Sequence, residues 1–240
     1  MPEKSDVLHI VVLKSIRLYG EFIARQVKEL WRNSEVLVFQ KGFDALESIQ
    51  VRTPDLLITG LNLEDMDGVE HLEPFSERDL PVLIVTSRAT PHTFNLLRNV
   101  RFDGIYDGVA EGLTNLRTAI SDVAARRLYV SPSFVTHLKK PKNITLDALT
   151  EKEQLVLSVI GDGCDDYEAA DRLRLSRFTI NTHRKVIMGK LGFHHKGQIM
   201  CYALQQGYVH ITPTGIYYPG FQRRLRELTV PKSDPAKECA

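Results

Sequence analysis

The sequence predicts two domains: an α/β domain with a doubly wound, five-stranded parallel (βα)5 sheet, followed by an all-α domain of four helices. Three observations carry this prediction. The chain has 240 residues, which suits about two domains of ~100–150 residues each. Short apolar runs alternate with helical patterns over the first 125 residues, as in strands joined by helical crossovers. From about residue 148 onward, helical patterns with capping signals replace the strands.

Five apolar runs in the N-terminal part are expected to form buried parallel strands, because each is short and almost uninterrupted. They are His9–Leu13, Val36–Phe39, Leu56–Thr59, Val82–Thr86 and Ile105–Tyr106. Apolar residues at helical spacing predict three helices between and after these strands. They are Ile16–Trp31, Phe43–Gln50 and Leu113–Ala125.

Doubly wound sheets bind their ligands at the carboxyl ends of the strands. The residues at those ends are Leu13-Lys14, Thr59-Gly60, Thr86 and Asp107-Gly108. The run from Pro54 to Gly68 around Gly60 resembles the third strand and following loop of a response-regulator receiver domain. In that family an aspartate ends this strand and accepts a phosphoryl group. Glycine has no side chain, so the resemblance implies a receiver fold that cannot be phosphorylated at this position.

The receiver resemblance also implies charged partners that this chain lacks. Receivers hold Mg²⁺ with acidic residues after the first strand, where this chain has Leu13 and Lys14. They place a lysine after the fifth strand, where this chain has Gly108 or Val109, depending on the alignment. Only the hydroxyl after the fourth strand is retained, as Thr86. The domain is therefore expected to be a pseudo-receiver.

Lys14 has two interpretations at this stage. Its ammonium could occupy the vacated metal site and lock the domain in one state, or the side chain could face solvent from a loop.

Nearby carboxylates are candidates for replacing the missing phosphate acceptor. Asp55, Asp65 and Asp67 are expected to serve in turns and helix caps instead.

Four helices are predicted in the C-terminal half. Thr150 and Glu153 form a capping box before the first of them, which extends to Ile160. The others are Tyr167–Leu173, a helix capped by Ser176 that runs to about Lys190, and Gly197–Gln206. A short helix, a tight turn and a basic, capped helix make the helix-turn-helix arrangement.

The segment from Leu149 to Val209 resembles the DNA-binding domain of LuxR/NarL-type regulators. The residues that carry the resemblance include Leu149-Thr150-x-x-Glu153, Glu168-Ala169-Ala170, Leu175-Ser176, Thr179-Ile180, Thr182-His183 and Lys190-Leu191-Gly192. The resemblance implies a two-domain response regulator that binds double-stranded DNA as a homodimer.

The third helix of this domain is expected to enter the major groove with its N-terminal turns toward the bases. The family resemblance implies base contacts mainly from Asn181, Thr182 and Lys185. The residues expected to contact phosphates are Thr179, Arg184, Lys190 and Lys196. His183 is either a packing residue or a DNA contact.

Family dimers use the last helix of the DNA-binding domain. The residues of that helix predicted at the dimer interface are Ile199, Tyr202 and Ala203.

The charge distribution agrees with an anionic partner for the second half. Residues 1–125 carry 13 Lys/Arg against 19 Asp/Glu, whereas seven bases and no acid lie between Arg172 and Lys196. A basic segment of this kind favours nucleic acid as a partner. The alternative interpretation is a pair of solvated faces on a small domain.

Composition excludes several classes of protein. Cys164, Cys201 and Cys239 are far apart and odd in number, which fits a reducing cytosol better than a disulfide framework. No apolar run approaches the ~18 residues of a membrane span, so a cytoplasmic protein without a membrane partner is expected. No nucleophile–base pair or phosphate-cradling glycine loop appears. We therefore predict no enzyme activity, no catalytic residues, no metal and no cofactor.

The domain boundaries follow from these patterns. They are residues 1–128 for the pseudo-receiver, 129–147 for a linker, 148–210 for the DNA-binding domain and 211–240 for a C-terminal extension. Within the extension, Tyr217–Phe221 and the following arginines could be an aromatic anchor and basic arm on DNA or on the protein's own body. Disorder is expected after about Val230, where the sequence becomes polar and proline-rich.

Two functional hypotheses follow. In the first, the chain is a transcription regulator that binds DNA without phosphorylation, and the pseudo-receiver serves dimerisation or partner docking. In the second, the vacated receiver pocket binds a small ligand or a partner protein and thereby controls DNA binding.

Overall fold

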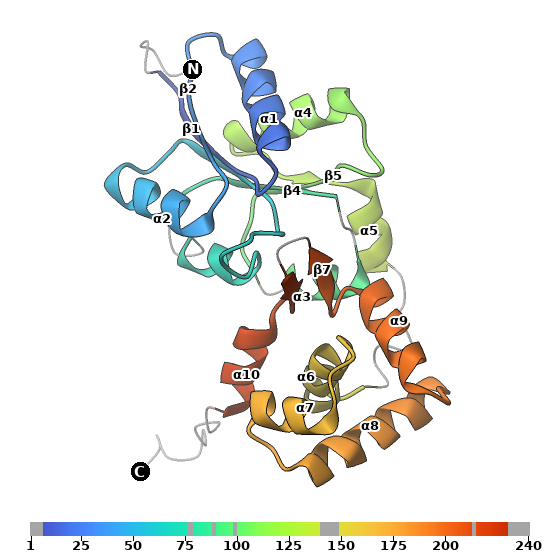
Figure 1. The fold of residues 1–240 in the computed structure, drawn as a ribbon. Helices are drawn as coiled ribbons and strands as arrows, with labels where there is room; N and C mark the ends of the chain where they lie inside the picture. The colour runs from blue at the N-terminus through green and yellow to red at the C-terminus, as the bar shows by residue number, and fades with distance from the viewer. Residues whose placement is uncertain are drawn as a thin grey trace, which may run out of the picture. The chain divides into compact units, whose positions relative to one another are not determined.

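The computed structural model describes residues 7–75, 79–87, 90–97, 100–139, 149–212 and 215–229 (Figure 1). The chain divides into two compact units, Met1–Pro141 and Lys142–Ala240. The first is an α/β unit and the second is largely helical. Each unit has its own buried core.

The first unit contains a parallel sheet of six strands in the order β2-β1-β3-β4-β5-β6. The strands are β1 (His9–Leu13), β2 (Glu35–Phe39), β3 (Leu56–Thr59), β4 (Val82–Thr86), β5 (Gly104–Asp107) and β6 (Tyr129–Val130). The step from β2 to β1 and then to β3 reverses the direction in which strands are added. The doubly wound parallel sheet predicted from the sequence is therefore confirmed, with one strand more than expected.

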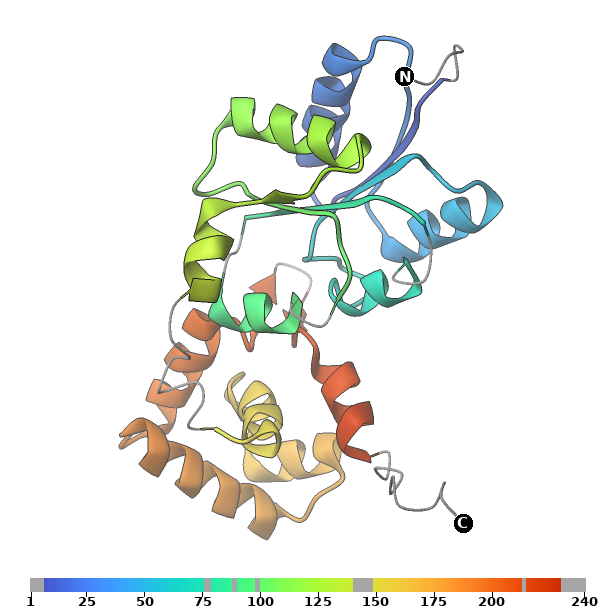
Figure 2. The same cartoon turned by 180° about the vertical axis from the view of Figure 1, so that it is seen from behind.

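Helices cover both faces of this sheet (Figures 1 and 2). The elements are α1 (Arg17–Leu30), α2 (Gly42–Val51), the 3-10 helix η1 (Glu70–Phe75), α3 (Pro91–Leu97), α4 (Leu113–Ala124) and α5 (Pro132–Lys139). Alternate residues of β1 point to opposite faces, as the two-residue period of a strand requires. Val12 packs with Val27 of α1 and Ile120 of α4, whereas Val11 belongs to the core under α2, α3 and α5.

The segment predicted as a linker begins with ordered structure, which corrects its expected extent. Tyr129–Val130 adds β6 to the sheet edge beside β5, and Ser131 N donates to Ile105 O at 2.9 Å. In α5, the Phe134 ring packs edge-on against Phe94 with centroids 4.8 Å apart. A two-residue strand is too short to produce a periodic pattern, so the sequence did not indicate it.

The second unit contains the four predicted helices. They are α6 (Glu151–Ile160), α7 (Asp166–Leu173), α8 (Arg177–Leu191) and α9 (Lys196–Gln206). The capping box is present, because Thr150 Oγ1 accepts from Glu153 N and Glu153 Oε2 accepts from Thr150 N. Ser176 Oγ accepts from Thr179 N at 3.0 Å and starts α8. Gly192 ends α8 with a φ of 68°, a conformation that side chains disfavour.

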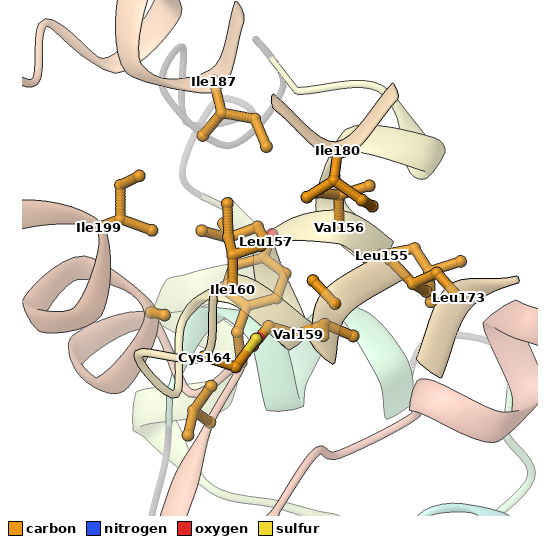
Figure 3. Close-up of a cluster of buried hydrophobic side chains, with 14 of the residues drawn as sticks. Leu155, Val156, Leu157, Val159, Ile160, Cys164, Leu173, Ile180, Ile187 and Ile199 are labelled. Atoms are coloured by element: carbon orange, nitrogen blue, oxygen red, sulfur yellow. The ribbon is translucent and has the colours of Figure 1, made fainter. Parts of the chain in front are cut away.

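The core of the second unit gathers apolar residues from α6, α7, α8 and α9 (Figure 3). Ile180 and Ile187 of α8 are fully buried in it. Their neighbour Val186 is 39% exposed, because it lies one position off the buried stripe of α8.

The C-terminal extension packs on the body of the second unit. It forms a hairpin of β7 (His210–Thr212) and β8 (Gly215–Tyr217), followed by α10 (Phe221–Thr229). Tyr218, Phe221 and Leu225 pack against the core of this unit. Of the two roles considered for the aromatic anchor, the structure supports attachment to the protein's own body. The expected disorder after Val230 lies outside the described residues. No helix in the described ranges is both long and apolar enough to span a bilayer.

Candidate functional site

The carboxyl edge of the sheet brings together most of the residues predicted there. Leu13 and Thr59 are register partners in β1 and β3, and Gly60 N donates to Leu13 O at 2.9 Å. Thr86 is buried at the end of β4, and Gly108 N donates to Thr86 O at 2.7 Å. Gly60 therefore directly follows the third strand, beside Leu13, as the sequence predicts.

Lys14 reaches across this edge. Its Nζ donates to Val85 O of β4 at 2.9 Å, so the side chain passes over the end of β3. A Cβ atom added to Gly60 would lie 3.0 Å from the Lys14 Nζ and 3.4 Å from its Cδ. The expectation of a solvent-facing lysine is therefore wrong, and the ammonium occupies the space above Gly60.

Burial changes the acid–base properties of this lysine. It lowers the pKa of Lys14 to about 8, because the charged amine loses hydration and gains no carboxylate partner. Within the part of the chain that the structure describes, it donates its hydrogen bond to a neutral carbonyl oxygen. An amine in this state can donate hydrogen bonds but cannot serve as a ligand for a divalent cation while it is protonated.

The remaining predicted residues at this edge also lack phosphoryl-transfer chemistry. Leu13 is 1% exposed and packs with Ala45 and Leu63 in a small apolar cluster. Val109 follows the end of β5 by two residues and is 75% exposed. Leu13 therefore contributes a buried alkyl group to this edge, and Val109 faces solvent.

The nearby carboxylates cap backbone groups, as the sequence predicts. Asp55 Oδ2 accepts from His9 N at 2.8 Å, and Asp67 Oδ1 accepts from Val69 N at 2.8 Å. The two oxygens of Asp65 accept from the N–H groups of residues 42 and 43 at the start of α2. These bonds confirm the cap and turn roles expected of all three aspartates.

Two buried groups near the edge escaped sequence reasoning. His71 Nε2 lies 2.9 Å from Thr59 Oγ1, and its Nδ1 lies 2.6 Å from Gly68 O. Burial lowers the pKa of His71 to about 4, so the ring is neutral and ties the loop to the end of β3. Asp107 is buried and accepts from Ser133 Oγ at 2.7 Å. A single His or Asp inside a strand-and-loop pattern carries no signal that would reveal these contacts.

Helix α8 of the second unit presents the predicted base-contacting residues together. Asn181, Thr182 and Lys185 are all exposed, and they fall within two turns of the N-terminus of α8. Thr182 Oγ1 donates to the Phe178 carbonyl at 2.9 Å. Asn181 Nδ2 donates to Asp166 Oδ2 of α7 at 3.1 Å, which orients its amide.

Two residues predicted to contact phosphates are engaged inside the unit instead. Arg184 is 5% exposed, and its Nη2 lies 2.6 Å from Asp166 Oδ1. Lys190 Nζ lies 2.7 Å from Glu153 Oε2, the carboxylate of the α6 capping box. The helical period directs these side chains toward α7 and α6. Burial of Arg184 contradicts its predicted phosphate contact, whereas Lys190 remains exposed and its phosphate contact stays a prediction.

The ion pair with Arg184 also affects the protonation state of Asp166. Burial acts to raise the pKa of Asp166, but hydrogen bonds from Asn181 and Arg184 outweigh it and hold the pKa below its usual range. The carboxylate is therefore ionised and joins α7 to α8.

Thr179 is partly buried with its hydroxyl 2.8 Å from Ser176 Oγ, whereas Lys196 is exposed at the start of α9. His183 is partly buried.

Two of the three residues predicted at the dimer interface are buried within their own unit. Ile199 and Ala203 are fully buried in their own unit, and a Cβ on Gly161 would lie 2.4 Å from the Ala203 Cβ. Tyr202 is partly buried against Phe193, with ring centroids 5.5 Å apart.

The sequence shows an apolar stripe on α9 but not which apolar residues point outward. The large apolar residues of α9 that face solvent are Met200, 36% exposed, and Leu204, 38% exposed.

One exposed aromatic side chain was not among the predicted site residues. Phe178, in the first turn of α8, is 80% exposed. Beside it, the Arg177 guanidinium lies 4.9 Å from the centroid of the Tyr167 ring. The sequence signal was available, because a phenylalanine two residues after a helix cap lies outside the buried stripe of Ile180 and Ile187.

Two family models match the chain. Residues 20–105 match the response regulator receiver domain, and residues 147–203 match the bacterial regulatory proteins of the luxR family. The first match ends within the sheet of the first unit, and the second covers α6, α7, α8 and most of α9.

Curated relatives match over most of the chain. The response regulator protein VraR of Staphylococcus saprophyticus is 27% identical over 183 residues, which cover 71% of this chain and 83% of VraR. The transcriptional regulatory protein DesR of Bacillus subtilis is 24% identical over 169 residues, 70% of this chain and 81% of DesR.

Solved structures share the two-domain fold. RcsB of Salmonella enterica serovar Typhimurium, bound to the promoter rprA, is similar with a TM-score of 0.58 and 18% identity, over 81% of this chain and 98% of RcsB. A second RcsB structure contains two dimers bound to two parallel DNAs. It is similar to this chain with a TM-score of 0.56 and 19% identity, over 83% of this chain and 99% of RcsB.

Proposed function

We propose that this chain regulates transcription by binding DNA through α8, without phosphorylation of its α/β unit. The premise is that its two family matches make it a response regulator of the LuxR/NarL type. VraR is named a response regulator, DesR a transcriptional regulatory protein, and a further relative, EvgA of Escherichia coli, a DNA-binding transcriptional activator. These names support the coarser part of the proposal. The role of α8 and the independence from phosphorylation are argued from the residues on α8 and at the carboxyl edge of the sheet.

The observation that carries DNA binding is the exposed face of α8. A helix presented by this motif enters the major groove with its N-terminal turns against the base edges. Asn181, Thr182 and Lys185 supply an amide, a hydroxyl and an ammonium there, and none of them is buried in the unit. Asn181 suits an adenine edge and Lys185 a guanine edge or a phosphate. The remaining phosphate contacts are proposed for Thr179 and Lys196.

Independence from phosphorylation rests on the carboxyl edge of the sheet. The acceptor position holds Gly60, and the Lys14 ammonium fills the adjoining space. A divalent cation would meet this positive charge and the buried alkyl side chain of Leu13. We therefore propose that the α/β unit is held in a single state, with Lys14 bridging the ends of β1 and β4.

The proposed protein is a homodimer in the cytoplasm, where its double-stranded DNA partner lies. Met200 and Leu204 supply an outward apolar surface on α9 for pairing of the DNA-binding units. The α/β unit adds a second such surface on α1, where Leu18 is 71% exposed and Phe22 is 42% exposed. Either dimerisation or the docking of a partner protein would cover this second surface. The alternative of a small-ligand sensor has less support, because Lys14 occupies the space that the ligand would need.

The experiment is a binding measurement with purified protein. Selection from fragmented genomic DNA at low salt is expected to yield bound sequences, and affinity for them is expected to fall as salt rises. The double variant Thr182→Ala, Lys185→Ala is expected to lose at least tenfold in affinity, since each base or phosphate contact contributes about 1–3 kcal/mol. Lys28→Ala removes the same charge from exposed α1 and serves as the control. Failure to select any DNA, or full affinity of the double variant, would contradict the proposal.

A further inference from the structure

The first turn of α8 contains three side chains, and two of them are engaged within the unit. Arg177 stacks on the Tyr167 ring of α7 and donates to its hydroxyl. The Thr179 hydroxyl lies 2.8 Å from the Ser176 hydroxyl that caps the helix. The third side chain, Phe178, is 80% exposed. The leading turn of this helix therefore presents an aromatic ring to solvent, flanked by polar groups that turn back onto the protein.

Phe178 lies on the same face of α8 as the proposed base contacts. Thr182 follows it by four residues, and the Thr182 hydroxyl donates to the Phe178 carbonyl at 2.9 Å. Residues three and four apart lie above one another on a helix, so Phe178, Thr182 and Lys185 form one exposed stripe. A helix that placed Thr182 and Lys185 in the major groove would bring Phe178 into it as well.

A phenyl ring has few favourable partners in that groove. Phosphates and the polar base edges offer it no hydrogen bond, and burying it against them would cost their hydration. The apolar group that the major groove presents is the C5-methyl of thymine, and phenylalanine is one of the side chains that contact it. Burial of a largely exposed ring against a methyl group removes apolar surface from water.

We propose that Phe178 reads thymine through its 5-methyl group and so adds an A·T requirement to the bound site. This inference rests on the proposed function, because it needs α8 in the major groove. It goes beyond that proposal by assigning sequence discrimination to a residue outside the polar set. The required thymine lies next to the base pair read by Thr182 or Asn181, since Phe178 precedes them by one helical turn.

The test uses the full chain and a site obtained by selection. Each thymine of the site is replaced in turn by deoxyuridine, which pairs identically but lacks the methyl group. Replacement at one position is expected to weaken binding of the unaltered protein about threefold to tenfold. The same replacement is expected to change binding by less than twofold in Phe178→Ala. Phe178→Leu keeps an apolar side chain and is expected to retain part of the methyl effect.

The control for other thymine contacts is Val186→Ala, which shortens the other large exposed apolar side chain of α8, two turns beyond Phe178. Its methyl effect is expected to equal that of the unaltered protein at the Phe178 position. Far-ultraviolet circular dichroism checks that each variant keeps its helices, which is expected because Phe178 is exposed.

The outcomes separate the two proposals. If the protein selects no DNA, the proposed function fails. If it binds a selected site but deoxyuridine has the same effect with Phe178 and with alanine, the thymine assignment is overturned and the proposed function stands. Equal affinity of Phe178→Ala for every site, with the methyl effect unchanged, would mean that the ring serves another partner and would also overturn the assignment.

Discussion

The carboxyl edge of the sheet and the exposed face of α8 present different chemical groups. At the sheet edge, Gly60 offers no side chain, Leu13 is buried, and the Lys14 ammonium reaches across to the carbonyl oxygen of Val85. On α8, Asn181, Thr182 and Lys185 are exposed within two turns of the helix N-terminus. A fold therefore does not by itself indicate its usual activity, and the site residues decide.

The two regions also differ in how their charges are satisfied. The Lys14 amine is partly buried and, among the described residues, donates to a carbonyl oxygen rather than to a carboxylate, whereas Arg184 is a buried cation paired with Asp166. An unpaired buried charge costs stability, while breaking an existing buried pair costs more. We therefore expect removal of the Lys14 charge to stabilise the first unit and removal of the Asp166 charge to destabilise the second.

The largest effect is expected from Asp166→Asn. The change keeps the shape of the side chain but leaves the Arg184 guanidinium buried without its counter-charge. The free energy of unfolding of the second unit is expected to fall by about 2–3 kcal/mol, somewhat less than for a fully buried pair because Asp166 is partly exposed. Urea denaturation measures it. Asp171→Asn, an exposed neighbour on α7, is the control and is expected to change stability by less than about 0.5 kcal/mol. Equal effects of the two changes would contradict the assigned role of Asp166.

The next effect is a pH dependence expected from Lys14→Met. The folded-state pKa of Lys14, about 8, lies below its ordinary value of 10.5, so the unfolded chain binds more protons between these two pH values. Burial of this amine therefore costs stability most fully below pH 8, and the cost fades as pH rises toward 10.5. Methionine removes the titration without removing the alkyl chain.

The measurement is the difference in unfolding free energy between Lys14→Met and the unaltered protein. That difference is expected to favour the variant at pH 7 and to shrink by about 2 kcal/mol by pH 10, since one pKa unit corresponds to about 1.4 kcal/mol. Lys28→Met on exposed α1 is the control and should show no such trend. A difference that does not vary with pH would show that the Lys14 ammonium is solvated.

A third effect concerns the pairing of DNA-binding units. Leu204→Glu places a charge on the outward apolar face of α9. Self-association measured by sedimentation equilibrium is expected to weaken about tenfold, because an unpaired charge at an apolar interface costs on the order of 1–3 kcal/mol. Gln205→Glu adds the same charge at the neighbouring exposed position. If both variants associate equally well, α9 does not form the dimer.

The smallest effect is expected from Gly60→Asp. The Cβ of the new side chain would lie 3.0 Å from the Lys14 Nζ, so we expect its carboxylate to pair with the ammonium. The residues that the structure describes contain no group of three or more His, Cys, Asp or Glu side chains that could hold Mg²⁺. Intact mass after treatment with acetyl phosphate and Mg²⁺ is therefore expected to remain unchanged. Gly112→Asp places the same side chain in open space and controls for nonspecific modification. A phosphoryl adduct specific to the Gly60 variant would show that a metal can still enter the edge.

Most of the fold could be predicted because its signals are local. Buried parallel strands read as apolar runs, and the helices of the second unit begin at capping residues that the structure uses as expected. The strand β6 was missed because two residues at a sheet edge show no period. Its place is set by pairing with β5, which is a contact between distant parts of the sequence.

The sites were less predictable, because side-chain direction depends on the partner element. Arg184 appeared as a surface base, yet Asp166 lies 18 positions earlier and meets it only after α7 packs on α8. Ile199 and Ala203 appeared as an interface because the apolar stripe of α9 does not reveal which side α6 covers. Lys14 allowed two directions until the position of Val85 was known. By contrast, Asn181, Thr182 and Lys185 were placed correctly on an exposed face, because a capped helix sets their spacing.

The central claim is that a receiver fold without its phosphoryl chemistry is joined to a helix that binds DNA. Its most direct test is the affinity of the purified full chain for a selected DNA site, with and without acetyl phosphate and Mg²⁺, together with intact mass on the same samples. The account predicts no mass change and the same affinity in both conditions. A mass increase of one phosphoryl group accompanied by tighter DNA binding would contradict it.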